Sequence, residues 1–320
     1  MFRRSRNLLA LIAALALTLS ALPAAALFGG EAEEPVEGAP IARALEITTY
    51  KDIPYTGQLQ AVEPAEGLTF ALADQPSRGT VALEGDTFVY TPKAGKTGKD
   101  SFTYTVTDAQ GRTSQPATVS VVIEKRRSQV TYRDMEDRAG YAAAVALAEN
   151  GIYVGRQIGQ DRFFDPDVPV TRSEFLSMAM EAAHIAVDPA VGLTGFADDG
   201  SIPTWAKGYA SAAAREGLIQ GVATREGVMF RGENAITLEE AAAIMDRLLN
   251  VADVYLEESE RAWADQAVAN MESVRVVSAG SFGSERLAEP VTMVQAAEML
   301  CAAMEVLESR DSSGKFFGLF

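Results

Sequence analysis

Residues 130–310 carry one sequence pattern three times, and this internal repetition constrains the fold more than any other feature of the chain. In each copy an aromatic-alanine pair opens one helix-type stretch, and an apolar-threonine pair opens a second. The pairs are Tyr141-Ala142, Trp205-Ala206 and Trp263-Ala264, followed by Val170-Thr171, Ile236-Thr237 and Val291-Thr292. The separations from aromatic residue to threonine are 30, 32 and 29 residues. We therefore predict an all-α region built from three related helix pairs.

The local signals inside the first copy are those of helices. Apolar residues recur every three or four positions from residue 141 to residue 152, within an alanine-rich segment that favours helix. Gly151 is placed to end that helix. Thr171, followed three residues later by Glu174, is a capping box, which predicts that a second helix begins there.

Residues 45–124 have the period of β-strands instead. Phe102, Tyr104 and Val106 alternate with hydroxyl residues, so one face of this strand is predicted to be buried. Two strand-type runs flank residues 84–86 and predict a hairpin. Further strands are predicted at residues 45–49, 57–62, 68–72 and 117–123. Short strands at this spacing predict a β-sandwich, which a change of composition at residues 125–128 separates from the helical region.

The N-terminal segment is predicted to be a targeting signal rather than part of the fold. Three arginines precede an apolar run over residues 8–22, and Ala24-Ala25-Ala26 provides a small-residue cleavage site. We interpret residues 1–26 as a secretory signal peptide and residues 27–44 as an acidic linker. The alternative, an uncleaved membrane anchor, fits less well because the run is short for a bilayer span and Pro23 breaks it.

Charge and rare residues exclude several classes of function. The chain has 28 Lys and Arg against 44 Asp and Glu, a formal net charge of −16, which argues against nucleic-acid binding. One cysteine and one histidine exclude an intrachain disulfide framework and a multi-histidine metal site. Cys301 is predicted to be a small buried residue, and His184 an ordinary residue at a helix end. Because the sequence carries no phosphate loop or zinc motif, we predict a non-catalytic protein with no cofactor.

The strand region resembles the bacterial Ig-like and cadherin-like modules of surface proteins. Residues 78–81, 88–92 and 98–108 carry this resemblance, which implies an Ig-like sandwich over residues 45–124 acting as a spacer or adhesin. Some relatives bind calcium through clustered carboxylates. Here a strand separates Asp100 from Asp108, so Asp108 is expected to shape a turn.

The helical region resembles the S-layer homology (SLH) repeat. The first copy is the fullest match, with Tyr132-Arg133-Asp134, Tyr141-Ala142, residues 151–155, Phe164-Asp165-Pro166 and residues 170–175. The resemblance covers residues 130–310, with repeats at about 130–187, 194–250 and 253–308, and leaves residues 311–320 as a tail. It implies a pseudo-threefold helical domain that attaches a protein non-covalently to acidic, often pyruvylated, polysaccharide of the bacterial cell wall.

The resemblance also implies a glycan site, in which the signature arginine meets an acidic sugar in a groove between repeats. Arg172 alone holds a signature position, because Leu238 and Met293 replace the other two. The predicted glycan-binding residues are Arg172, Asp134, Tyr141, Asp198 and Trp205. The alternatives are that Arg172 pairs with a carboxylate on its own helix, and that Trp205 and Trp263 fill the core.

These observations predict a secreted protein of the bacterial cell wall or S-layer. Its helical repeats bind wall polysaccharide, and its Ig-like domain faces outward. A competing hypothesis of another class is that degenerate repeats serve protein–protein or S-layer assembly without binding glycan.

Overall fold

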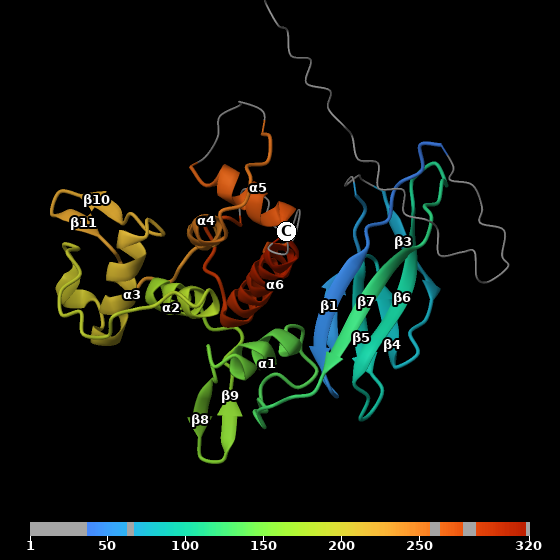
Figure 1. The fold of residues 1–320 in the computed structure, drawn as a ribbon, viewed down its shortest axis with the longest axis horizontal. Coiled ribbons are helices and arrows are strands. Elements are labelled where there is room, and N and C mark those ends of the chain that lie inside the picture. Colours follow the sequence, from blue (N-terminus) through green and yellow to red (C-terminus); the bar gives the residue numbers. More distant parts are fainter. Residues whose placement is uncertain (1–36, 63–66, 257–262, 278–285, 318–320) are drawn as a thin grey trace, which may run out of the picture.

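The computed structural model describes residues 37–62, 67–256, 263–277 and 286–317. The predicted signal peptide, and the predicted linker as far as residue 36, lie outside these ranges. Figure 1 shows two regions side by side, a strand sandwich formed by the N-terminal part and a cluster of helices formed by the C-terminal part. This confirms the predicted order of a β region followed by an α region.

The strand region is a sandwich of two sheets. Its strands are β1 (Leu45–Tyr50), β2 (Tyr55–Gln58), β3 (Thr69–Asp74), β4 (Gly79–Glu84), β5 (Thr87–Pro92), β6 (Gly98–Thr107) and β7 (Ala117–Glu124). One sheet has the order β1-β7-β6-β3 and the other β2-β5-β4, with β1 parallel to β7. The predicted hairpin is β4–β5, and Phe102, Tyr104 and Val106 are buried as the alternation predicts.

Two details of the strand region bear on its predictions. The strand predicted at residues 57–62 is β2, which begins and ends earlier, at Tyr55 and Gln58. The carboxylate of Asp108 accepts the backbone N–H groups of Gln110 and Arg112, so it shapes a turn as expected. Tyr104 fixes the N-terminal approach to the sheet, because its hydroxyl donates to the carbonyl oxygen of Arg43.

The helical region contains six α-helices among the described residues. They are α1 (Tyr141–Glu149), α2 (Arg172–Ala182), α3 (Thr204–Arg215), α4 (Leu238–Leu249), α5 (Asp265–Ser273) and α6 (Met293–Phe317). A small hairpin joins the helices of the first two copies: β8 (Arg156–Ile158) with β9 (Asp161–Phe163), and β10 (Val222–Thr224) with β11 (Gly227–Met229). The sequence pattern does not predict these hairpins. Residues 311–317, predicted as part of a tail, continue α6.

A closed ring of three backbone hydrogen bonds joins the starts of α2, α4 and α6. The N–H of Val170 donates to Val291, that of Val291 to Ile236, and that of Ile236 to Val170, each at 2.9 Å. Each of these residues directly precedes the threonine that caps its helix. Thr171 and Thr237 form complete capping boxes with Glu174 and Glu240, which confirms the predicted start of α2.

The helices also contact one another in a cyclic order. The first helix of each copy packs on the second helix of the preceding one: α3 on α2, α5 on α4, and α1 on α6. One apolar core runs through all three copies, and it includes the fully buried side chains of Phe164, Phe175 and Phe230.

Hydrogen bonds at the ends of the first helices set the register between copies. The carbonyl oxygens of Leu147, Ala213 and Met271 each accept two N–H groups from the turn that follows the helix. Trp205 and Trp263 both lie eight residues before that carbonyl, whereas Tyr141 lies six residues before it. The structure therefore aligns Tyr141 with Lys207, two residues away from the alignment that the aromatic-alanine pairs predict.

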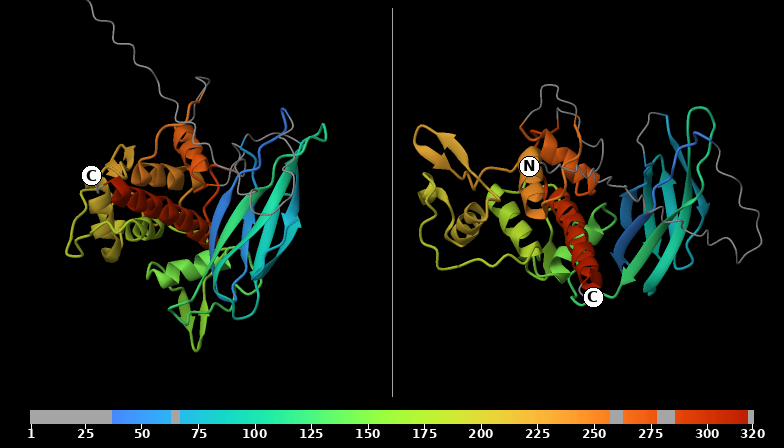
Figure 2. Two further views of the ribbon diagram at one scale, coloured as in Figure 1. Left: turned by 45° about the vertical axis from the view of Figure 1, so that its right-hand side comes forward. Right: turned by 45° about the horizontal axis from the view of Figure 1, so that its top comes forward.

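The two regions are attached at the predicted boundary. Glu149, at the end of α1, accepts the backbone N–H groups of Arg127 and Ser128 and the Ser128 hydroxyl. Next to this linker, Tyr50 and Ile53 of the sandwich pack against Ala142 and Val145 of α1. Figure 2 shows β1 and β7 alongside α1 and α6 in two further views.

Candidate functional site

Asp134 and Asp198, two of the predicted glycan-binding residues, hold the backbone of their own copies. The Asp134 carboxylate accepts the N–H groups of Phe164 and Asp165 at 2.9 and 2.8 Å. The Asp198 carboxylate does the same for Phe230 and Arg231, at 2.8 and 2.7 Å. Both side chains therefore lock the end of a hairpin to the start of their copy.

Arg172 lies at the contact between the first and second copies. Its Nη1 is 3.2 Å from Oε1 of Glu240, and its guanidinium carbon is 5.8 Å from the centre of the Phe230 ring. Only 11% of the side chain is exposed, and Nε has no hydrogen-bond partner among the described residues. Burial lowers the pKa of the guanidinium, and Glu240 opposes that effect. The carboxylate that pairs with Arg172 therefore belongs to α4. The alternative drawn from the sequence, a partner on α2, the helix of Arg172 itself, is wrong.

Trp205 is exposed, so the prediction that it fills the core is wrong. It is 51% exposed and lines a pocket of about 430 Å³ formed by α3 and the end of α2. Tyr209, one helical turn later, also lines the pocket, and its hydroxyl donates to Oε1 of Glu181 at 2.5 Å. This hydrogen bond is the largest contribution to raising the pKa of Tyr209 to about 12, so the phenol stays protonated at neutral pH.

The rest of the pocket comes from the segment that follows α2. His184 ends α2 in a left-handed conformation, as its predicted position at a helix end implies, and lines the same pocket. Ile185 and Val187 provide apolar surface. The pocket therefore lies between two copies and combines an exposed indole, a phenol, a carboxylate and an imidazole.

The remaining aromatic residues of the pattern lie elsewhere. Trp263 is 64% exposed, so its predicted core position is also wrong. Tyr141 is half-buried and packs against both the helical core and the cluster formed with the Ig-like sandwich. The structure thus distributes the five predicted residues over several places. Asp198 is linked to Arg172 through Phe230, and Trp205 lines a pocket of its own.

The sequence held a signal for only part of the pocket. Tyr209 follows Trp205 by four residues, which places both on one helix face. Glu181 and His184 come from another copy, and no spacing in the chain points to them. The pocket therefore brings two aromatic side chains of one copy next to polar side chains of another.

No group of three or more metal-ligating side chains occurs among the described residues. The adjacent acids Asp198 and Asp199 point to different partners, since Asp199 pairs with Lys207 at 2.6 Å. In the same described part of the chain, every helix is too short or too polar to traverse a lipid bilayer.

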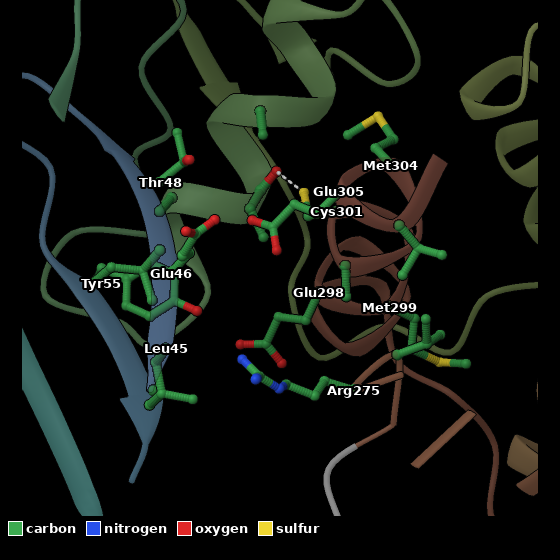
Figure 3. Close-up of a pocket in the computed structure, with 18 of the residues that line it drawn as sticks. Leu45, Glu46, Thr48, Tyr55, Arg275, Glu298, Met299, Cys301, Met304 and Glu305 are labelled. Carbon is green, nitrogen blue, oxygen red and sulfur yellow. Dashed lines mark hydrogen bonds between the residues drawn. The ribbon is translucent and has the colours of Figure 1, made fainter. Parts of the chain in front are cut away.

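A second and larger hollow lies between the sandwich and the helices. It measures about 1310 Å³ and is lined by β1, β2, α1 and α6. Figure 3 shows Glu46 and Tyr55 on the sandwich side, and Glu298, Cys301 and Glu305 on α6. Cys301, predicted to be buried, is only partly so, and its thiol lies 3.6 Å from the carbonyl oxygen of Ala143. No pattern in the sequence predicts this cleft.

Comparison with known families identifies one module in each region. Residues 37–122 match the bacterial Ig domain, and residues 195–242 match the S-layer homology domain. The second match spans the copy that contains Trp205, Asp198 and the hairpin β10–β11.

Two curated proteins are similar to parts of this chain. An exoglucanase, XynX, from Acetivibrio thermocellus is 32% identical over 37% of the chain, and a surface-layer 125 kDa protein from Lysinibacillus sphaericus is 28% identical over 39%. The chain spans 11% and 10% of these relatives. Among solved structures, the fibronectin(III)-like modules of Clostridium thermocellum CbhA are 14% identical over 28% of the chain and 96% of that chain, with a TM-score of 0.18. The family matches therefore identify a bacterial Ig domain in the strand region and one S-layer homology domain in the helical region.

Proposed function

We propose that this chain is a non-catalytic protein of the bacterial cell surface, exported through residues 1–26 and anchored to wall polysaccharide by its helical region. The Ig-like domain acts as spacer or adhesin. The S-layer homology match and the similarity to a surface-layer protein support the anchoring role. The similarity to an exoglucanase covers 11% of that enzyme, which fits a shared attachment module rather than a shared active site.

We further propose that the helical region comprises three S-layer homology repeats in a pseudo-threefold arrangement. The ring formed by Val170, Ile236 and Val291 supports this, because three equal hydrogen bonds relate the three copies. The cyclic packing of first helices on preceding second helices supports it independently.

The observation that carries glycan binding is the pocket at Trp205. An indole that is half-exposed in a hollow leaves its apolar face in water, which favours a ligand that covers it. The Tyr209 hydroxyl and the Glu181 carboxylate line the same pocket and are groups that can bind sugar hydroxyls. Asp134 and Asp198 contribute by fixing the backbone of their copies.

Arg172 stays a predicted contact for an acidic sugar. To reach a sugar carboxylate its guanidinium has to exchange the Glu240 carboxylate for the ligand, which conserves the charge-assisted bond. We therefore expect Trp205 to matter more than Arg172 for affinity, and Arg172 to matter for selection of acidic polymers.

Binding to purified wall sacculi tests the proposal. Trp205→Ala is expected to weaken binding about five- to thirtyfold, because it removes a stacking interaction of the order of 1–2 kcal/mol. Trp263→Ala is the matched control, since it removes an indole from another copy that is more exposed, at 64% against 51%. Equal binding by the wild type and Trp205→Ala would remove this pocket from the mechanism, and no binding by the wild type would refute anchoring.

The assembly hypothesis keeps one supporting observation. Residues 130–310 contain 14 basic and 29 acidic residues, and such a surface repels an acidic polymer at long range. Light scattering with and without wall polymer separates the two functions. Self-association that rises with protein concentration, with no polymer bound, favours assembly.

A further inference from the structure

The Ig-like domain covers one of the three helix pairs of the ring. By the cyclic packing order, α1 on α6 is the counterpart of α3 on α2, where the Trp205 pocket is open. At the α1–α6 pair, strands β1 and β2 lie across the groove instead (Figures 2 and 3). Ala143 on α1 and Glu305 on α6 both face this covered groove.

The cover is held by few contacts. The buried apolar contact between the regions consists of Tyr50 and Ile53 against Ala142 and Val145, at one end of the interface. Alongside it lies the cleft of about 1310 Å³, across which Nη2 of Arg275 donates a hydrogen bond to the carbonyl oxygen of Ala44 at 3.4 Å. Small interfaces between domains normally permit relative motion, so this geometry is that of a hinged lid rather than a fused core.

Glu305 faces the cleft in an unfavourable electrostatic setting. The cleft walls displace water from its carboxyl group, and Glu308 on α6 and Glu46 on β1 repel its charge, while Arg275 attracts it. Together these effects raise the pKa of Glu305 to about 7. Tyr55 and Cys301 are the other titratable groups nearby. Figure 3 shows Glu46 and Glu305 directed toward one another across the cleft.

Glu298, two turns earlier on α6, is the less suitable sensor. Its Oε1 would lie 3.1 Å from a Cβ added at Gly140, so it sits at the N-terminus of α1. The partial positive charge of a helix N-terminus favours an ionised carboxylate there. Displacement of water from the cleft raises the pKa of Glu298 to about 6, a smaller shift than that of Glu305.

We propose that the Ig-like domain is a reversible lid on the α1–α6 groove, shut in acid and released as the medium becomes neutral. When the lid opens, Glu305 regains water and loses its carboxylate neighbour on β1. Its pKa then returns toward 4.5, so the shut form binds more protons than the open form between about pH 4.5 and pH 7. The contribution of Glu305 to closure is therefore full below that window and lost as the pH rises through it. The lid does not depend on glycan binding.

Cys301 is a native probe of the lid, because it is the single cysteine of the chain and lines the cleft. The rate of modification of its thiol by a maleimide, divided by the rate for the urea-unfolded chain at the same pH, measures the open fraction. In the wild type we expect protection to fall roughly tenfold or more between pH 5 and pH 8. Glu305→Gln is expected to abolish the change between about pH 6 and pH 8 and to leave only the smaller change below about pH 6 that Glu298 contributes.

Two further sets of variants define the result. Glu216→Gln changes an exposed carboxylate directly after the far helix α3 and should behave as the wild type. Ile53→Asp and the milder Ile53→Ala weaken the apolar contact and should lower protection at both pH values, with unchanged helical circular dichroism. For Ile53→Asp, X-ray scattering should also give a larger radius of gyration. Protection that is insensitive to both pH and Ile53, or a change in protection between about pH 6 and pH 8 that is as large in Glu305→Gln as in the wild type, would overturn the proposal.

Discussion

At the scale of single residues, the structure separates side chains that build a copy from side chains that face solvent. Asp134 and Asp198 belong to the recurring pattern because each satisfies two backbone N–H groups that no neighbouring helix or strand reaches. A carboxylate with both oxygens engaged in this way is a fixed part of the fold. Recurrence in the sequence therefore marks a structural need at these positions, whatever the copy binds.

The hydrogen bonds of Asp198 predict a large loss of stability in Asp198→Ala. Two N–H groups lose a charged acceptor, so we expect the helical region to lose about 2–4 kcal/mol of its free energy of unfolding. Urea denaturation followed by tryptophan fluorescence measures this directly, because both tryptophans lie in the helical region. Asp188→Ala is the control, since that exposed carboxylate accepts a single N–H, from Ala190. Equal losses in the two variants would contradict the assigned role.

At this scale the helix cap was predicted correctly from the sequence, whereas the core positions predicted for the two tryptophans were wrong. Thr171 and Glu174 could be predicted because a capping box depends only on residues three apart. The exposure of Trp205 and Trp263 depends on which helix lies opposite, which no local pattern contains. The same holds for Arg172, whose partner Glu240 is 68 residues away along the chain.

At the scale of elements, the helices were predictable and the short hairpins were not. Helix pairs leave a period of three to four residues over many positions, whereas β8–β9 and β10–β11 have strands of only three residues each. Their position is fixed by the aspartates that bind the segment after each hairpin. The second copy has two more residues between Trp205 and the end of its first helix than the first copy has after Tyr141. Matching the aromatic-alanine pairs missed this difference, because helices of different length keep the same apolar pattern.

The ring of backbone bonds predicts that Ala235→Pro is tolerated. Pro169 and Pro290 precede Val170 and Val291 in the ring, and Ala235 precedes Ile236 at the equivalent place. The N–H of Ala235 donates no hydrogen bond among the described residues, so its removal leaves no acceptor unpaired. We expect Ala235→Pro to stabilise the helical region by about 0.4–1 kcal/mol by restricting the unfolded chain. Thermal unfolding tests this prediction, with Ala183→Pro at the end of α2 as the control variant. A loss of stability in Ala235→Pro would show that the three segments differ in backbone conformation.

At the scale of the whole molecule, the two regions and their boundary were predictable from composition and period, but their docking was not. The contact depends on residues far apart in the chain, such as Ile53 with Val145, and on the cyclic order that leaves α1 and α6 next to the sandwich. A boundary rich in Lys and Arg reads as a free linker in sequence. The structure instead ties it to α1 through Glu149, whose side chain is 1% exposed.

The attachment of the linker predicts protease resistance that depends on Glu149. Residues 125–127 are Lys-Arg-Arg, so trypsin reports whether this backbone can leave the surface. Glu149→Ala removes the acceptor for the N–H groups of Arg127 and Ser128, and we expect cleavage there to become about five- to tenfold faster, the equivalent of about 1–1.4 kcal/mol of local opening. Burial alone would raise the pKa of Glu149, but hydrogen bonds from Ser128 and Arg127 outweigh it and lower the pKa. This attachment is therefore retained above about pH 4.5 and weakens as the pH falls through the lowered value, opposite in sign to the effect of Glu305. Glu216→Ala is the control, and equal cleavage rates in the two variants would mean that the linker is held by other contacts.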